Sequence, residues 1–174
     1  MIMLIITEAA LFMYLLFSYY YLYAQSSTPW PPDGQLGLKV ALPNTIVLIL
    51  SSLAVAAAER SIRRNELPAM LWRLLIGIAL GAVFAGLQIR EWFTKPFGIT
   101  SHAFGSLYYV VTGFHMAHLI VGLLMLIAVL IWARRGRYAA GRHLGVTTTG
   151  YYWHFVDVVW LTVFFSFYLW PRLT

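Results

Sequence analysis

The stretch FGSLYYVVTGFHMAHLIVGLLMLIAVLIWA, residues 104–133, contains no aspartate, glutamate, lysine or arginine. A helix that crosses the hydrocarbon core of a bilayer needs about 20 predominantly apolar residues, so this stretch is long enough to span a membrane. Four further segments, at about 2–23, 41–58, 69–93 and 146–170, are also predominantly apolar and about long enough to span a membrane. The sequence therefore predicts an all-α membrane protein with five transmembrane helices.

The composition excludes most other classes of protein. Of the 174 residues, 61% are hydrophobic and 10% are charged, whereas a soluble domain carries about 25% charged residues. So few charges cannot cover a soluble surface, and the same shortage excludes a disordered chain or a nucleic-acid-binding module. Cysteine is absent, which excludes disulfides, a thiol nucleophile and Cys-ligated metals. Because the connecting loops are short, residues 1–174 are predicted to form a single transmembrane domain.

The basic residues predict the orientation of the chain in the membrane. Eight of the twelve lysines and arginines lie in or beside the loops after the second and fourth segments. Loops rich in basic residues face the cytoplasm, so the N-terminus is predicted inside and the C-terminus outside, in a bacterial inner membrane. The eight residues are Arg60, Arg63, Arg64, Arg73, Arg134, Arg135, Arg137 and Arg142.

Several ionisable side chains lie well inside the predicted spans. Glu8 is in the first, His115 and His118 are in the fourth, and His154 and Asp157 are in the fifth. A charge at the centre of a span costs roughly 2.5–3.5 kcal/mol on insertion scales, so each of these residues needs a structural or functional reason. Both pairs have i, i+3 spacing, which places their members on one side of a helix. We expect the four residues of the two pairs to form an internal polar cluster between the fourth and fifth spans.

Four interpretations of these residues stay open on spacing alone. The histidines and the aspartate could ligate a metal. A haem could be held between His154 and either His115 or His118. Glu8 and the pairs could form a proton path. Finally, the side chains could form a hydrogen-bond network that fixes the helices against one another.

Small residues mark the third span as a packing surface. Gly77, Gly81 and Ala85 are spaced by four residues, so they form a stripe on one face of the predicted helix. Such stripes allow the backbones of neighbouring helices to approach closely. We expect this face to lie against another helix.

Several motifs along the chain are specific enough to compare with known families. In chain order they are ITEAALF at 6–12, WPPDG at 30–34, LPNT at 42–45, GAVFAGLQIREW at 81–92, GSLYYVVTGFHMAHLIVG at 105–122 and YYWHFVDVVW at 151–160. With these motifs the chain resembles subunit III of the haem–copper terminal oxidases, the cytochrome c oxidase family, over nearly its whole length. The family's usual chain has seven helices, and the five spans here resemble the last five.

The resemblance implies an accessory subunit that is not catalytic by itself. Such a subunit docks on subunit I, stabilises it, and supports proton uptake and oxygen access. It carries no haem, copper or other metal, which belong to the partner subunits I and II. Glu8 matches the family's buried, carbodiimide-reactive glutamate, so we expect it either to hydrogen-bond to a neighbouring helix or to take part in proton handling. The family's first two helices form one arm of a cleft that holds phospholipid, and without that arm a partner chain would have to complete such a site.

Two alternatives and two local departures accompany the resemblance. An accessory subunit of a nitric oxide reductase belongs to the same family, and a free-standing transporter or b-type cytochrome is a more distant alternative.

The family often carries a histidine pair after its fourth helix, where this chain has Glu59 and Arg60. It often has an acidic residue before its last helix, where this chain has Thr147. Contacts near the inner interface are therefore expected to differ from those of the family.

Overall fold

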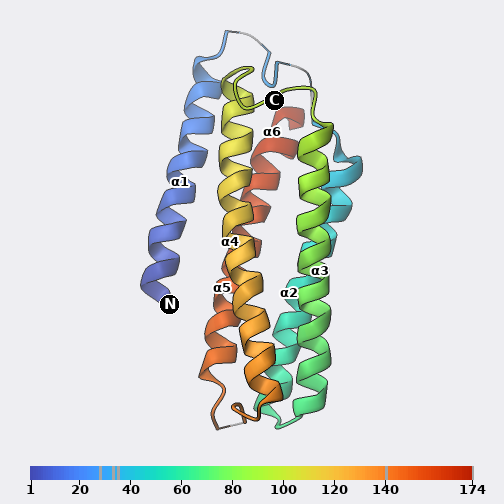
Figure 1. Ribbon diagram of the computed structural model, residues 1–174. Coiled ribbons are helices and arrows are strands. Elements are labelled where there is room, and N and C mark those ends of the chain that lie inside the picture. The colour runs from blue at the N-terminus through green and yellow to red at the C-terminus, as the bar shows by residue number, and fades with distance from the viewer. Residues whose placement is uncertain (28, 33, 35, 140, 174) are drawn as a thin grey trace.

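The protein is a bundle of long antiparallel helices (Figure 1). The computed structural model describes residues 1–27, 29–32, 34, 36–139 and 141–173, so Asp33 of the WPPDG motif lies outside the described residues. Within the described part of the chain, five helices are long and apolar enough to cross a membrane, and no β-strand is present. The elements are α1 (Ile2–Gln25), α2 (Leu38–Arg63), α3 (Leu67–Thr94), α4 (Ala103–Arg134), α5 (Leu144–Phe164), the π-helical turn η1 (Phe165–Leu169) and α6 (Trp170–Leu173).

The five predicted spans match these helices, with α5, η1 and α6 together forming the fifth span, Leu144–Leu173. Each helix extends a few residues beyond its apolar segment. For example, α2 continues through Glu59 and Arg60 to Arg63. Each added residue of an established helix forms one more hydrogen bond, and Glu and Arg are good helix formers, so the edge of an apolar segment does not end a helix.

Local residue preferences shape the starts and ends of the helices at the connections between them. Between α2 and α3, Asn65 adopts a left-handed conformation (φ 61°), which asparagine tolerates better than most residues. Pro68 then lies in the first turn of α3, where its missing N–H is not needed. At the start of α4, the His102 Nδ1 atom accepts a hydrogen bond of 2.9 Å from the Gly105 backbone N–H.

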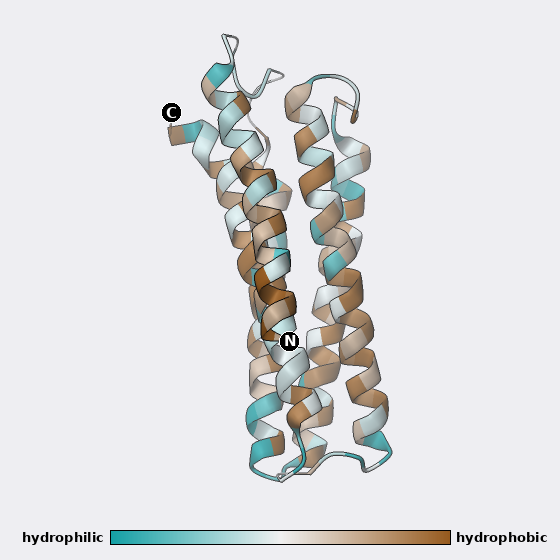
Figure 2. Ribbon diagram, turned by 90° about the vertical axis from the view of Figure 1, so that its left-hand side faces the viewer, coloured by the Kyte–Doolittle hydropathy of each residue, from teal (hydrophilic) through white to brown (hydrophobic). Residues whose placement is uncertain are grey.

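The two ends of the bundle differ in chemistry. The α2–α3 and α4–α5 connections lie together at one end, here called the basic end because the eight arginines named above lie in or beside these connections. The other end, here called the aromatic end, carries the α1–α2 and α3–α4 connections and the last residues of the chain (Figure 1). Hydrophobic residues dominate the middle of the ribbon (Figure 2). Which end faces the cytoplasm stays a prediction of the arginine count.

A cluster of buried and partly buried rings holds the aromatic end together. Tyr19 of α1 lies 4.4 Å from Phe167 of η1, measured between ring centroids, and 5.8 Å from Trp30 of the α1–α2 loop. Phe104 of α4 contacts both Trp30 and Phe167, at 5.5 and 5.7 Å. Buried aromatic pairs contribute about 0.5–1.5 kcal/mol each beyond the area that they bury. This cluster therefore connects the first and last spans to α4.

Helix α1 is the least enclosed of the five spans. It packs against α4 and α5. In its most hydrophobic 18-residue stretch only 11% of the residues are buried, whereas in that of the fifth span 56% are buried. Its contact with the end of the chain includes a hydrogen bond of 2.9 Å between the Tyr20 hydroxyl and Ser166 Oγ. The remaining face of α1 is apolar and open, as expected for a helix that faces lipid or a partner in the membrane.

Candidate functional site

Glu8 and His118 form a polar contact between α1 and α4. The Glu8 Oε2 atom lies 2.9 Å from His118 Nε2, and the His118 Nδ1–H donates to the Phe114 carbonyl oxygen at 2.7 Å. Phe12 covers the imidazole edge-on at 5.2 Å. The Glu8 side chain is 29% exposed, because α1 has no neighbour on its outer side. In this chain the glutamate is therefore half-buried, not buried as expected from the resemblance.

The hydrogen bonds of His118 limit which atom of the Glu8–His118 contact can carry the proton. Because Nδ1 carries the proton given to the backbone carbonyl, Nε2 is either a neutral acceptor or a charged donor. In the first case Glu8 holds the shared proton, and in the second case His118 holds it. The proton can pass between the two atoms without movement of either side chain, which is a property suited to proton handling.

His115 joins α4 to the fifth span. Its ring is fully buried, and Nε2 donates to the Val156 carbonyl oxygen at 3.2 Å. The ring lies 4.9 Å from Trp160 and 5.8 Å from Phe84, measured between centroids. The arrangement connects α3, α4 and α5 around one imidazole.

His154 and Asp157 face α2 rather than α4. The His154 Nδ1 atom lies 2.6 Å from Ser52 Oγ. Asp157 is 9% exposed, and its Oδ1 atom has no hydrogen-bond partner among the described residues. The four residues expected to form one cluster between the fourth and fifth spans are thus divided among contacts with α1, α2 and α5. The physical reason is that i and i+3 positions differ by about 60° around a helix, enough to face different neighbours.

The two departures from the family pattern meet in space. The Thr147 hydroxyl donates to Glu59 Oε1 at 2.8 Å, across the α2–α5 interface near the basic end. Arg63 donates to the same oxygen at 2.7 Å. Helix α2 supplies the carboxylate of this contact, and the fifth span supplies the hydroxyl. The two sequence differences therefore form one complementary contact.

The small residues of α3 lie against two different neighbours. A Cβ atom added to Gly77 would lie 2.8 Å from Val55 of α2, and Ser51 donates to the Gly77 carbonyl oxygen at 2.8 Å. One turn later, a Cβ atom added to Gly81 would lie 2.7 Å from the indole of Trp153 in α5. Ala85 is partly buried and packs against the core.

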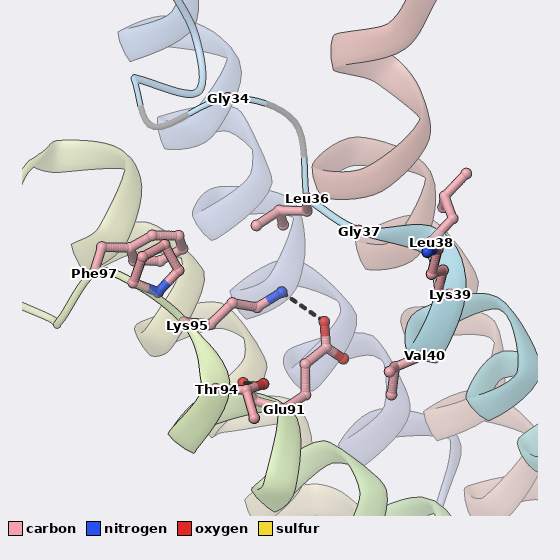
Figure 3. Close-up of a pocket in the computed structure, with 11 residues that line it drawn as sticks. Gly34, Leu36, Gly37, Leu38, Lys39, Val40, Glu91, Thr94, Lys95 and Phe97 are labelled. Atoms are coloured by element: carbon pink, nitrogen blue, oxygen red, sulfur yellow. Dashed lines mark hydrogen bonds and ion pairs between the residues drawn. The ribbon is translucent and has the colours of Figure 1, made fainter.

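A buried network at the aromatic end was not expected from the sequence, in which Glu91 lies near the end of the third predicted span. The Glu91 side chain is 4% exposed, and its Oε1 atom accepts hydrogen bonds from Lys95 Nζ at 2.7 Å (Figure 3) and from the Tyr168 hydroxyl at 2.8 Å. The Tyr168 hydroxyl lies 3.1 Å from that of Tyr108, and the Lys95 ammonium lies over both rings. The i, i+4 spacing of Glu91 and Lys95 was the available sequence signal.

No metal site is visible in the described part of the chain: no group of three or more His, Cys, Asp or Glu side chains is placed to hold an ion. The division of the histidines among three helix contacts accounts for this.

Comparisons with a family model and with curated proteins all point to one protein family. Residues 1–172 match a family model described as "Cytochrome c oxidase subunit III". The chain is 37% identical to "Cytochrome c oxidase subunit 3" of Synechocystis sp., over 97% of this chain and 73% of that protein. It is also 37% identical to the protein of that name from Thermostichus vulcanus, over 90% of this chain and 79% of the relative. The protein of that name from Latimeria chalumnae is 35% identical, over 98% of this chain and 68% of the relative.

Proposed function

Because this chain belongs to the cytochrome c oxidase subunit III family, we propose that it serves as an accessory, non-catalytic subunit of a haem–copper terminal oxidase in aerobic respiration. In this role it docks laterally on subunit I, stabilises it, and supports proton uptake and oxygen access. The haem and copper of the complex belong to its partner subunits. The five membrane-spanning helices make the chain an integral membrane protein.

The family match over residues 1–172 carries the proposal, and the polar side chains that connect the helices of the bundle agree with it. His115, His118 and His154 each contact a different helix of the bundle. Polar contacts of this kind between transmembrane helices contribute about 0.6 kcal/mol each on average and fix helix register. A rigid bundle with a mostly apolar outer surface suits a subunit that packs against another membrane protein.

Glu8 and His118 support a part in proton handling. Their shared proton lies at the surface of the bundle, since the Glu8 side chain is 29% exposed. A half-buried carboxylate within a span is expensive unless a proton, a partner or water compensates it. At this position the pair can exchange a proton with groups outside the chain, including those of a docked subunit.

Purification of the complex tests the accessory role. A tagged form of this chain, extracted from its native membrane in mild detergent, is expected to bring subunits I and II with it. The visible spectrum should show haem in the complex and none in the chain after its separation. Consumption of oxygen rather than nitric oxide by the same preparation distinguishes an oxidase from a nitric oxide reductase. Copurification with nitric oxide reductase subunits, or a haem band from this chain, would overturn the proposal.

The variant Glu8→Gln tests proton handling. The amide preserves the shape of the side chain and can still bond to His118, so assembly should be unchanged. Turnover of the complex should fall most steeply at high pH, where proton uptake limits the rate. The matched control is Glu66→Gln, which removes one exposed carboxylate at the basic end. Equal pH profiles for wild type and Glu8→Gln would remove this part of the proposal while leaving the accessory role intact.

A further inference from the structure

Polar side chains at seven-residue intervals along α2 bond across to the fifth span. Seven residues are nearly two helical turns, so these side chains lie on one face of α2, about 10.5 Å apart along the helix axis. The three contacts are those of Trp160 with Thr45 at 3.0 Å, of His154 with Ser52 at 2.6 Å and of Thr147 with Glu59 at 2.8 Å. This series is here called the α2–α5 ladder.

The ladder is open to solvent at the basic end. The Glu59 side chain is 14% exposed, and its Oε1 atom accepts the hydrogen bonds of Thr147 and Arg63. The other oxygen, Oε2, lies over Gly150, because a Cβ atom added to this glycine would be 3.5 Å from it. Gly150 precedes His154 by about one turn. Its missing side chain leaves room for a water molecule between the Glu59 carboxylate and the imidazole.

Asp157 lies at the inner end of this route, about one turn beyond His154. It is 9% exposed, and its Oδ1 atom has no hydrogen-bond partner among the described residues. The Ser52 hydroxyl and the His154 ring face the carboxyl group. An ionised aspartate inside a span is expensive when donors are missing, whereas a protonated carboxyl group is neutral and carries a donor of its own. These surroundings therefore favour an Asp157 that holds a proton.

Large rings close the ladder on the aromatic side of Asp157. Trp160 is fully buried, and its indole meets Phe84 of α3 edge-on at 4.9 Å. The indole N–H is bonded to Thr45, and an indole nitrogen can donate but cannot accept a proton. A route for protons from the basic end would therefore stop at Asp157 and would not cross the membrane.

Other titratable groups also face the fifth span from the helices packed against it. Arg63 of α2 lies near Tyr151, and Glu8 of α1 lies near Tyr152. From α4, His115 bonds to the Val156 carbonyl oxygen, and His118 bonds to Glu8 and to the Phe114 carbonyl oxygen. The route along the ladder thus uses none of the atoms of the Glu8–His118 contact.

We propose that Asp157 is a proton-storage site, which fills and empties from the basic end through Glu59 and His154. A proton taken up by Glu59 passes over Gly150, by way of a water molecule, to the His154 ring. The ring gives its Nδ1 proton to Ser52 Oγ while the Ser52 hydroxyl proton moves to Asp157. Each step moves one proton between neighbouring polar atoms, so no further reactant is needed. The proposal does not rest on the function proposed above.

Infrared spectroscopy of the tagged chain, purified together with its partner subunits, tests whether Asp157 stores a proton. A protonated carboxyl group has its own C=O stretching band, and rapid mixing with D2O shifts this band when a deuteron replaces the proton. Asp157→Asn preserves the shape of the side chain and should remove one exchanging band. If that variant does not assemble, Asp157→Glu gives the same assignment, because it moves the band instead of removing it.

Two pairs of variants test the route. Gly150→Ala places a methyl group against Glu59 Oε2 and should slow the exchange of the Asp157 band about tenfold, the effect of losing one hydrogen-bonded link. Its control, Gly113→Ala, adds the same group to open space in α4 and should not slow it. Glu59→Gln still accepts from Thr147 but cannot carry a proton, so it should also slow the exchange. Glu66→Gln removes an exposed carboxylate at the same end and should not.

Two outcomes would overturn the proposal. If both Asp157→Asn and Asp157→Glu leave every protonated carboxyl band unchanged, Asp157 is ionised and stores no proton. If the members of either variant pair exchange at equal rates, protons reach Asp157 by another path. Neither measurement depends on which subunits copurify or on the pH profile of Glu8→Gln. Failure of this proposal is therefore distinguishable from failure of the proposed function.

Discussion

The packing of Trp153 between two helices makes the stability of the bundle sensitive to single methyl groups. Trp153 is 1% exposed, and its indole lies between Gly81 of α3 and Gly122 of α4. A Cβ atom at Gly81 would lie 2.7 Å from Trp153 Cη2 and 3.0 Å from Leu123 Cδ2. The α4 backbone at Gly122 lies close to the other side of the indole, since even an added Cβ atom there would be only 2.8 Å from Cε3, so the ring has little room to move. The variant Gly81→Ala therefore forces the ring and the helices apart.

The expected magnitude follows from two opposing effects. Inserting a methyl group into a well-packed core destabilises by about 1–3 kcal/mol, and replacing glycine with alanine inside a helix stabilises by up to about 1 kcal/mol. The net loss for Gly81→Ala is about 1 kcal/mol. Gly86→Ala, one to two turns further along α3, adds its methyl group to open space and should gain up to about 1 kcal/mol. Because the gain in helix propensity is common to both variants, the difference between their stabilities, about 1–3 kcal/mol, measures the cost of packing the methyl group at Gly81.

Thermal unfolding of the purified complex in detergent measures both variants. The melting temperature should fall for Gly81→Ala and stay equal or rise for Gly86→Ala. In the background Trp153→Phe, where the ring atoms nearest to Gly81 are absent, Gly81→Ala should lose most of its effect, since contacting residues couple. Equal melting temperatures for the two alanine variants, or full additivity with Trp153→Phe, would refute the packing of the indole between α3 and α4.

Three further substitutions test the polar contacts. His115→Leu should lower stability by about 1 kcal/mol, because leucine fills most of the ring's volume but loses its bond to α5; an unchanged melting temperature would contradict that bond. Ser52→Ala should lower stability by a similar amount through its lost bond to His154, and an unaltered NMR signal of the His154 ring nitrogens would argue against the contact. Tyr168→Phe removes a donor to the Glu91 carboxylate and should destabilise by about 1.5–3 kcal/mol, measured against Tyr21→Phe, which removes a hydroxyl from the exposed face of α1.

The spans were predictable from the sequence because hydrophobicity and length determine them almost alone. The prediction of 104–133 differs from α4 (Ala103–Arg134) by one residue at each end. The interruption of the fifth span by η1 was not predicted, since a π-helical turn depends on local packing and has no clear residue signature. The left-handed Asn65 likewise depends on the meeting of α2 and α3.

The candidate site was only partly predictable, because spacing places residues on one helix but does not choose their neighbours. Spacing grouped His115 with His118, yet the structure directs the first to α5 and the second to Glu8 of α1. Glu91 lies 77 positions before its donor Tyr168, so no local pattern connects the two. Thr147 and Glu59 were recognised only as separate departures, and their contact required the packing of α2 on α5.

The π-helical turn η1 has a consequence for how the chain ends. A π turn contains about one residue more than an α-helical turn of the same span, so every later residue is rotated by about 100° relative to an uninterrupted helix. After this rotation Trp170 lies 5.5 Å from Tyr20 of α1, edge to face, and Arg172 donates to the Leu36 carbonyl oxygen of the α1–α2 loop. The rotation of the last residues about the helix axis, and not only the length of the span, therefore decides which residues they contact. Removal of one residue from the turn would leave a span of nearly the same length whose tip points away from the first helix.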